Sequence, residues 1–422
     1  MSESIQTKVK EEGVQLISLL KWMLLSTITG VVVGVIGSVF AHTVTYVTEL
    51  RIEHPQILFG LPLGGLVIVF LYKIAGEEKN TGTNRVLTVI RTEGEEMRGR
   101  IAPLILVSTV ITHLFGGSSG REGAALQFGA SVGNFLGKRF HLNESDRKIV
   151  IMSGMSAAFA ALFGTPMAAA VFSMEVVSVG VMYYAALVPC MFAAFTAQHV
   201  SVLMNVRVLG HPHLVESVPN FYSLNALKVV FLAVCFAFAG MLFCKMLHET
   251  EHLLKKWFSN PYLRIVFGGV AVIALRFLLG TEDYLGLGEE ILHHSFDEPA
   301  VFGIFILKMI FTCLTLCAGF KGGEIVPSLF IGATLGSSLS VMLNLPPDVC
   351  AGCGMVGVFV AVTNCPISSM LIAFELFGFA GMPYYCITVA ISYLVSGYKS
   401  LYKEQKIMYS KTENKYINRM TD

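Results

Sequence analysis

Long apolar segments follow one another through almost the whole chain, and they constrain its fold more than any other feature. The segments 16–47, 182–204 and 226–247 each reach the length of about 20 residues with which a helix crosses a bilayer. None of them alternates between apolar and polar residues as the strands of a membrane barrel do. The sequence therefore predicts an all-α polytopic membrane protein that lies in a lipid bilayer.

The composition excludes several other classes of protein. Of the 422 residues, 54% are hydrophobic and 14% are charged, against about 25% charged in soluble domains. Thirty basic and 29 acidic residues leave a net charge of +1, so no basic surplus exists for binding nucleic acid. Only two of the nine cysteines form a CxxC pair, Cys350 and Cys353, without a second pair nearby. We therefore expect no metal site and no cofactor.

Several apolar segments are too short to cross a bilayer, and glycine and proline punctuate this part of the pattern. Examples are 124–136, 149–163, 350–362 and 367–379. Helices that end inside a membrane must place their unpaired backbone groups along a protein cavity or a water path. The pattern thus predicts broken and re-entrant helices, with a binding site near the midplane of the bilayer.

Two motifs recur in the same order in both halves of the chain. GASVG at 129–133 matches GATLG at 332–336, and the segments 166–175 and 366–375 both begin with proline and end with glutamate. Chance recurrence of small residues that pack helices explains the first match but poorly explains the second. We infer a duplication, and transporters often place substrate where two repeats meet.

The chain divides accordingly into four parts. We expect a cytoplasmic N-terminal segment at 1–15, a first membrane half-repeat at 16–205, a second half-repeat at 206–402 and a cytoplasmic tail at 403–422. The polar N-terminus does not suit a cleaved signal peptide. The stretch 280–299 is expected to form an exposed loop between membrane segments.

A glycine-rich loop, GGSSGREG at 116–123, leads directly into an apolar helix. Helix N-termini offer unpaired N–H groups, and glycine lets an anion approach them closely. A nucleotide-binding Walker loop would require Lys-Ser or Lys-Thr where Arg121 and Glu122 stand. Because an ionisable group inside a membrane is costly, Glu122 is a candidate functional residue rather than a simple helix-capping one.

The second half repeats this arrangement in GGEIVP at 322–327. Two acids at helix starts, Glu122 and Glu324, suggest a proton path beside an anion path. A proton on Glu122 would remove its negative charge and free the N–H groups for an anion, which couples the two ions. For Glu324, a capping role or a salt bridge to Lys321 is the alternative.

Four segments resemble, in this order and spacing, the CLC family of anion channels and transporters. They are GREG at 120–123, GTPMAAAVFSME at 164–175, GGEIVPSLFIGATLG at 322–336 and PISSMLIAFEL at 366–376. The resemblance implies a CLC-type inverted-repeat fold and a homodimer with one pore in each subunit. It also implies that Glu122 is the gating glutamate, with the backbone of Gly120, Arg121 and Gly123 around an outer anion and the amides of Glu324 and Ile325 around a central one.

Some positions depart from the chloride-transporting pattern of the family. Thr83 stands where a serine is usual, with Asn84 after it, and Val176 follows Glu175 where many chloride exchangers have a second acid. Glu324, at a usually apolar position, resembles the fluoride-exporting branch. By resemblance Tyr402 is the inner tyrosine that donates to the anion; Tyr398 is a rival, and an interfacial role for Tyr402 is the alternative.

These observations predict a transporter that exports fluoride in exchange for protons across the bacterial inner membrane, with both termini in the cytoplasm. A chloride or mixed-anion channel, or a chloride/proton exchanger of the same fold, is the alternative. An intramembrane enzyme using Glu122 or His113 as base would lack a nucleophile and a metal cluster, so we do not expect an enzyme. We interpret His113 as a packing residue, and Glu175 and Glu375 as structural hydrogen-bonding residues.

Overall fold

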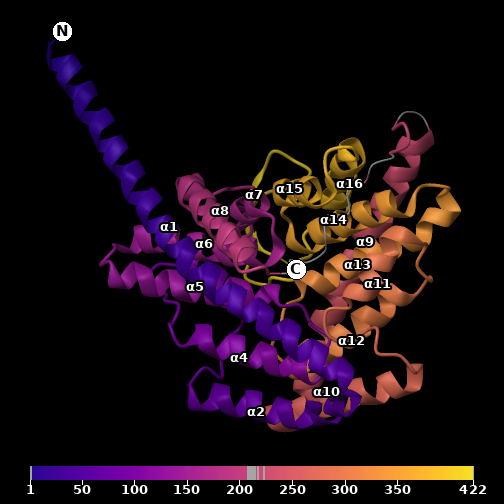
Figure 1. Cartoon of the computed structure of the whole chain (residues 1–422). Coiled ribbons are helices and arrows are strands. Elements are labelled where there is room, and N and C mark those ends of the chain that lie inside the picture. Colours follow the sequence, from indigo (N-terminus) through magenta and orange to yellow (C-terminus); the bar gives the residue numbers. More distant parts are fainter. Residues whose placement is uncertain (1, 207–214, 216–217, 222–223, 422) are drawn as a thin grey trace.

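The computed structural model describes residues 2–206, 215, 218–221 and 224–421, and it confirms the all-α expectation (Figure 1). Within those residues the chain forms sixteen α-helices, joined by 3₁₀ turns at η1 (Pro55–Gly60) and η2 (Tyr184–Ala186). The helices are α1 (Ser2–Glu53), α2 (Leu61–Ile74), α3 (Thr83–Arg91), α4 (Ile101–Leu114), α5 (Glu122–Arg139), α6 (Glu144–Phe163), α7 (Pro166–Glu175), α8 (Leu187–Leu203), α9 (Leu224–Trp257), α10 (Pro261–Leu279), α11 (Glu289–Asp297), α12 (Ile304–Ala318), α13 (Ile325–Leu343), α14 (Pro347–Thr363), α15 (Pro366–Phe377) and α16 (Met382–Val395).

The helices differ in length as the segment pattern predicts. Six stretches among the described residues are long and apolar enough to cross a membrane. They are Gln15–Glu53, Pro55–Ile74, Tyr184–Leu203, Leu224–Trp257, Pro261–Leu279 and Ile325–Leu343. Five further apolar helices have 10–17 residues, and α7 has 10. Figure 1 shows α4, α5 and α6 gathered in one half of the molecule and α12 to α16 in the other.

Equivalent helices pack closely in each half, α5 against α6 and α13 against α14. A Cβ atom on Gly129 would lie 2.3 Å from the carbonyl oxygen of Gly154, and one on Gly332 would lie 2.0 Å from that of Gly354. No real Cβ atom fits at such distances. The repeated small-residue motifs therefore bring two helix backbones into contact at matching positions of both halves.

Gly332→Ala should lower the stability of the protein by about 1–3 kcal/mol, because the added methyl group must push two backbones apart. The measurement is the midpoint of thermal unfolding in detergent. Gly99→Ala is the matched control, since nothing lies within 4 Å of the position of its Cβ atom. Equal midpoints for the two variants would contradict the role of Gly332 in close packing.

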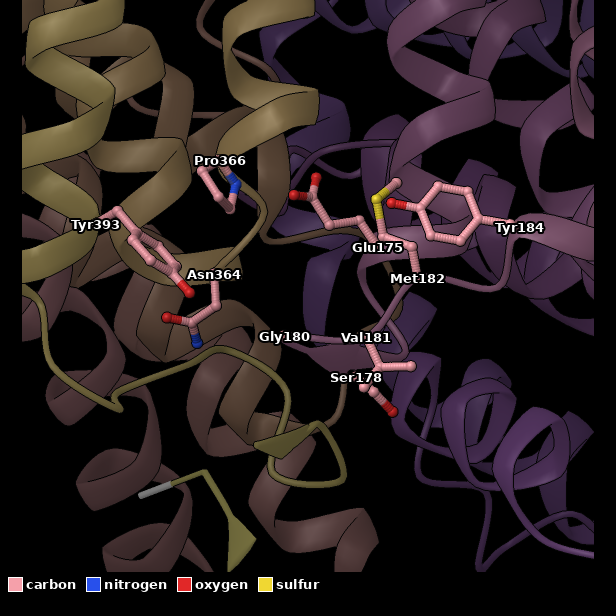
Figure 2. A pocket seen from close by; sticks show the side chains of 9 residues that line it. All are labelled: Glu175, Ser178, Gly180, Val181, Met182, Tyr184, Asn364, Pro366 and Tyr393. Carbon is pink, nitrogen blue, oxygen red and sulfur yellow. The ribbon is translucent and has the colours of Figure 1, made fainter. Parts of the chain in front are cut away.

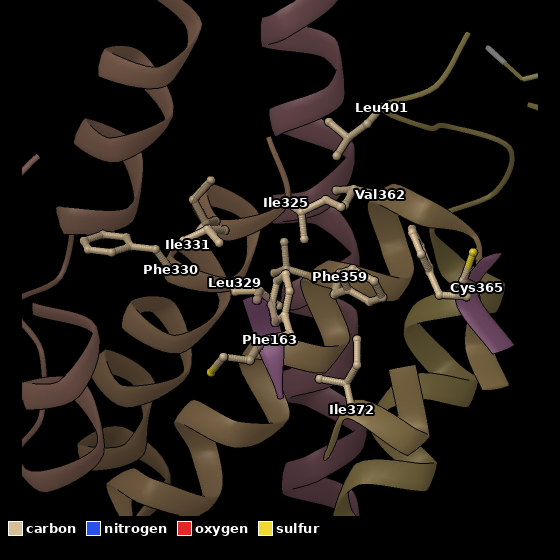
Figure 3. Packing of buried hydrophobic residues seen from close by; sticks show 14 of the residues in the cluster. Phe163, Ile325, Leu329, Phe330, Ile331, Phe359, Val362, Cys365, Ile372 and Leu401 are labelled. Atoms are coloured by element: carbon tan, nitrogen blue, oxygen red, sulfur yellow. The ribbon is translucent and has the colours of Figure 1, made fainter. Parts of the chain in front are cut away.

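The N-terminus of α13 lies within the apolar core (Figure 3). Ile325, its first residue, is fully buried and belongs to the same cluster as Phe163, Phe359 and Val362. This surrounding of apolar side chains excludes water from most of the helix start. Electrostatic interactions with its N–H groups are correspondingly stronger than at a solvated helix end.

The expectation of an exposed loop at 280–299 is wrong. The segment contains α11, and Leu285, Leu287 and Phe296 are buried in the main core. Gly286 and Gly288 have φ values of +56° and +77°, so the backbone turns sharply before the helix. The polar residues of this segment, including the acids that suggested exposure, alternate with apolar residues that pack inward.

The segment after residue 403 forms a small sheet, which the sequence did not predict. Strand β2 (Lys406–Tyr409) pairs in parallel with β1 (Ser178–Val179) and antiparallel with β3 (Tyr416–Met420). Side chains attach this sheet to the membrane helices: Arg91 donates to the backbone of Glu404, and Lys411 Nζ lies 2.5 Å from Asn364 Oδ1. The tail is thus packed on both halves of the chain.

Candidate functional site

The two glycine-rich loops meet at a pair of glycines. The N–H of Gly120 donates to the carbonyl of Gly323, and the N–H of Gly323 donates to the carbonyl of Gly120, both at 2.7 Å. A Cβ atom on Gly323 would lie 2.4 Å from the backbone nitrogen of Gly123. Only glycine permits this contact. It brings the starts of α5 and α13 together, as the duplicated loops suggested.

Glu122, the first residue of α5, is completely buried at this junction. Neither carboxylate oxygen has a hydrogen-bond partner among the described residues. Arg121 Nε lies 3.7 Å from Oε1, too far for a good hydrogen bond. A buried carboxylate without donors is unfavourable in its charged form. The side chain is thus placed to take up a proton or to move toward a donor.

Glu324 lies beside Glu122 at the N-terminus of α13. Its Oε2 atom is 3.5 Å from the position that a Cβ atom on Gly123 would occupy, and the residue is only partly buried. The structure records no ion pair between Glu324 and Lys321 within the described chain. Instead the Lys321 ammonium lies 4.4 Å from the ring centroid of Tyr72. The salt-bridge alternative for Glu324 therefore finds no support in the geometry.

The start of α3 reaches the same region through Gln127. Gln127 Nε2 donates to the carbonyl of Gly123 at 3.1 Å and lies 3.5 Å from the position of a Cβ atom on Gly82. Thr83, the first residue of α3, is buried. The oxygen of the Asn84 side chain accepts a hydrogen bond from the N–H of Glu404 at 3.1 Å, which joins α3 to the segment that contains Tyr402.

Tyr402 is buried, and its hydroxyl group has no hydrogen-bond partner among the described residues. The charge of Glu324 acts on it. The hydroxyl of the rival Tyr398 is instead 3.0 Å from Ser410 Oγ, in the C-terminal segment. A buried hydroxyl without a partner is costly, so an acceptor is expected at Tyr402 and not at Tyr398.

Glu175 and Glu375 bind the helix starts of the opposite halves, which confirms their structural interpretation. Glu375 accepts from the N–H groups of Met167 and Ala168 at 3.0 and 2.9 Å. Glu175 accepts from those of Ile367 and Ser368 at 3.1 and 2.9 Å. Each glutamate therefore caps the equivalent helix of the other repeat.

A cavity of about 550 Å³ adjoins Glu175 on the seam between the halves (Figure 2). Its lining comes from the end of α7, the strand β1 region and the second half: Glu175, Ser178, Gly180, Val181, Met182, Tyr184, Asn364, Pro366 and Tyr393. Because the Glu175 carboxylate already accepts hydrogen bonds from backbone amides, it is not a free carboxylate in this cavity.

Sequence reasoning missed two buried cations near the site, Arg51 and Lys308, and found His113 only as a packing residue. His113 is fully buried, but the structure records no hydrogen bond to either ring nitrogen within the described residues. Lys308 stands alone among the apolar residues of α12. An ionisable residue inside an apolar segment is a signal that could have identified it.

Comparison with known proteins gives consistent similarities. Residues 63–397 match the family described as voltage gated chloride channel. The chain is 36% identical to a chloride/fluoride channel protein of Pseudomonas syringae pv. tomato, over 93% of this chain and 87% of that protein. It is 24% identical to the H(+)/Cl(-) exchange transporter ClcA of Vibrio campbellii, over 84% and 81% of the two chains. The solved structure of a CLC-type fluoride/proton antiporter superposes with a TM-score of 0.88 at 34% identity, covering 92% of this chain and 98% of that one.

Proposed function

Because the chain belongs to the CLC family of channels and transporters, which are not enzymes, we propose that it exports fluoride from the bacterial cytoplasm in exchange for protons. Coupling of anion transport to protons is named for two of the relatives, the H(+)/Cl(-) exchange transporter and the fluoride/proton antiporter. The choice of fluoride rests on one observation: the relatives whose names include fluoride, a chloride/fluoride channel protein and a fluoride/proton antiporter, are 36% and 34% identical, against 24% for the chloride exchanger. Glu324 in the second glycine-rich loop agrees with that choice.

The groups around the two carboxylates suit a small, strongly hydrated anion. An ion that gives up its water needs several donors in return. The start of α13 offers the amides of Glu324 and Ile325, and Tyr402 offers a buried hydroxyl without a partner among the described residues. Thr83 and Asn84 are the further donors that we assign to the anion path. The backbone of Gly120, Arg121 and Gly123 is assigned to the outer anion.

Protonation of Glu122 couples the two ions in this scheme. In its charged form the carboxylate competes with fluoride for the N–H groups, and in its neutral form it leaves them to the anion. Val176 stands where many chloride exchangers have a second acid, so protons need another group on the inner side. We assign this step to Glu324, which is partly exposed and lies beside Glu122.

Efflux from liposomes loaded separately with fluoride and chloride tests the proposal. Fluoride leaving and a proton entering move charge in the same direction, so a potassium ionophore must carry the compensating current. Fluoride efflux that draws protons inward is expected, with protein-free liposomes as the control for leak. Fast chloride efflux without proton movement, and fluoride no faster, would establish the alternative, an anion channel of the same fold.

Tyr402→Phe should slow fluoride efflux by about 10-fold or more, since a hydrogen bond to a charged group contributes about 1.5–3 kcal/mol. Tyr398→Phe is the matched control, because its hydroxyl already contacts Ser410. Initial efflux rates at equal amounts of protein in the liposomes are compared. Equal rates for the two variants would remove Tyr402 from the anion path.

We also propose the arrangement of the protein in the cell. Two subunits form a homodimer in the bacterial inner membrane, and both termini lie in the cytoplasm. The two half-repeats occupy 16–205 and 206–402, between the cytoplasmic segments 1–15 and 403–422. The boundary between the halves adjoins residues 207–214, which lie outside the described part of the chain.

A further inference from the structure

A group of basic side chains is buried beside the loop that precedes α5. Arg51, at the end of α1, is 5% exposed, while His113 of α4 and Lys308 of α12 are completely buried. The charge of Arg51 acts on both His113 and Lys308, and that of Arg121 acts on His113. The elements that supply these residues are far apart in sequence. The fold therefore gathers basic side chains beside the loop that leads to Glu122.

The acids near this group are already engaged. Glu282, whose charge acts on Arg51, has its carboxylate 2.6 Å from Arg276 Nη2. Glu122 is 3.7 Å from Arg121. The Lys308 ammonium has hydrogen-bond acceptors of another kind, since it donates to the backbone carbonyls of Tyr284 and Gly286 at 3.2 and 2.8 Å. The described residues thus leave Arg51 without a close carboxylate.

Arg51 is the permanently charged member of this group that lacks a partner among the described residues. Its Nε and Nη1 atoms are buried, and no described residue accepts a hydrogen bond from them. A guanidinium group does not lose its proton in proteins, so it cannot become neutral. An unpaired charge removed from water is strongly unfavourable unless a counter-ion lies beside it. The guanidinium therefore indicates a missing anion.

Space for one small ion exists next to this guanidinium. A Cβ atom on Gly286 would have as its nearest neighbours Arg51 Nη2 at 3.7 Å, His113 Nδ1 at 3.8 Å and Arg51 Nη1 at 3.9 Å. On the other side there is no such room, because a Cβ atom on Gly116 would lie 2.9 Å from Leu58 Cδ1 and 3.1 Å from Arg51 Nη1. The absent side chain of Gly286 therefore leaves room for about one atom beside these nitrogen atoms, and the tight packing at Gly116 closes the other side. Lys308 fixes its wall by binding the carbonyl of Gly286.

We propose that a single halide ion binds between Arg51, His113 and Gly286, at a site separate from the anion positions at Glu122 and Glu324. A monatomic ion fits this space, whereas phosphate or a carboxylate would require room for several atoms. The ion would neutralise Arg51 and accept hydrogen bonds from its guanidinium group. This site lies beside the loop that leads to Glu122. Its occupation by a halide does not depend on which halide the protein transports.

Crystals of the wild-type protein grown in bromide test the site directly. An anomalous peak within hydrogen-bonding distance of the Arg51 guanidinium is expected. Absence of a peak there, with water or nothing in its place, overturns the proposal. This measurement needs no variant, so it tests the proposed halide site even if substitutions at Arg51 prevent folding. A peak at Arg51 in a protein that carries no fluoride would overturn the proposed function and leave this site standing.

Bromide titration by calorimetry gives a second test in detergent. Arg51→Gln should weaken one class of bromide site by at least about 30-fold, the effect of removing one partner of a buried charge pair. Arg51→Lys, which keeps the charge, should retain most of that binding. Arg85→Gln is the control for loss of a positive charge, since Arg85 is partly exposed and paired with Glu95. Identical titrations of Arg51→Gln and the wild type would contradict the site.

Discussion

Glu122→Gln should reduce proton uptake during fluoride efflux by about 100-fold or more, the contribution of a positioned proton-transfer group. The amide has nearly the same shape but cannot bind and release a proton. In the structure, Glu122 is buried at the junction of Gly120 and Gly323, without a hydrogen-bond partner among the described residues. No described group is hydrogen-bonded to the Glu122 side chain that could exchange protons in its place, so proton exchange at this point should fail.

The measurement is external pH recorded together with fluoride efflux from liposomes, with a potassium ionophore present. Glu290→Gln serves as the control, because it removes an exposed carboxylate from the start of α11. The control should retain the wild-type ratio of protons to fluoride. Undiminished proton uptake in Glu122→Gln would show that protons cross by a route that does not include this side chain.

The double variant Glu175→Ala and Glu375→Ala should produce the largest loss of stability. Each glutamate accepts from two backbone N–H groups at the start of a helix in the opposite half. An amide left without its acceptor costs about 1–3 kcal/mol, so each single substitution, which removes the acceptor of two amides, should cost about 2–6 kcal/mol. Ser368 loses an additional acceptor, since its hydroxyl lies 2.5 Å from Glu175.

Thermal unfolding in detergent, followed by the amount of monodisperse protein remaining, measures the effect. Glu290→Ala is the matched control, an exposed glutamate in a helix start. Glu175→Gln and Glu375→Gln keep one acceptor oxygen each and should lie between the control and the alanine variants. If the alanine variants unfold at the temperature of the control, the two caps contribute nothing to stability.

Much of the fold could be predicted from the sequence because its signals are local. The length of each apolar segment predicts a helix, and proline at 166 and 366 predicts where two of them begin. The glycine-rich loop before Glu122 also predicts a helix start that attracts negative charge. These features depend on neighbouring residues, which the sequence displays directly.

The remaining features depend on contacts between distant residues. Arg51 ends a long apolar helix and looks in sequence like an interfacial residue, but the turn at Gly286 encloses it. Leu285 and Leu287 flank a glycine in a stretch that also contains acidic residues, and such a sequence resembles a loop. Only the packing of α11 shows that both leucines are buried. The strands after residue 403 are short, and β2 pairs not only with β3 but also with β1, which lies in the first half of the chain.

The exchange of caps between Glu175 and Glu375 has a consequence for how such a chain could arise. Residue 175 of the first half contacts residues 367 and 368, while residue 375 of the second half contacts residues 167 and 168. This reciprocity is the pattern of an isologous interface, in which two identical chains related by a two-fold axis each supply what the other lacks. A half-length ancestor would therefore have satisfied both helix starts with a single glutamate, provided that it assembled as a pair, and fusion of two copies would have preserved every one of these bonds.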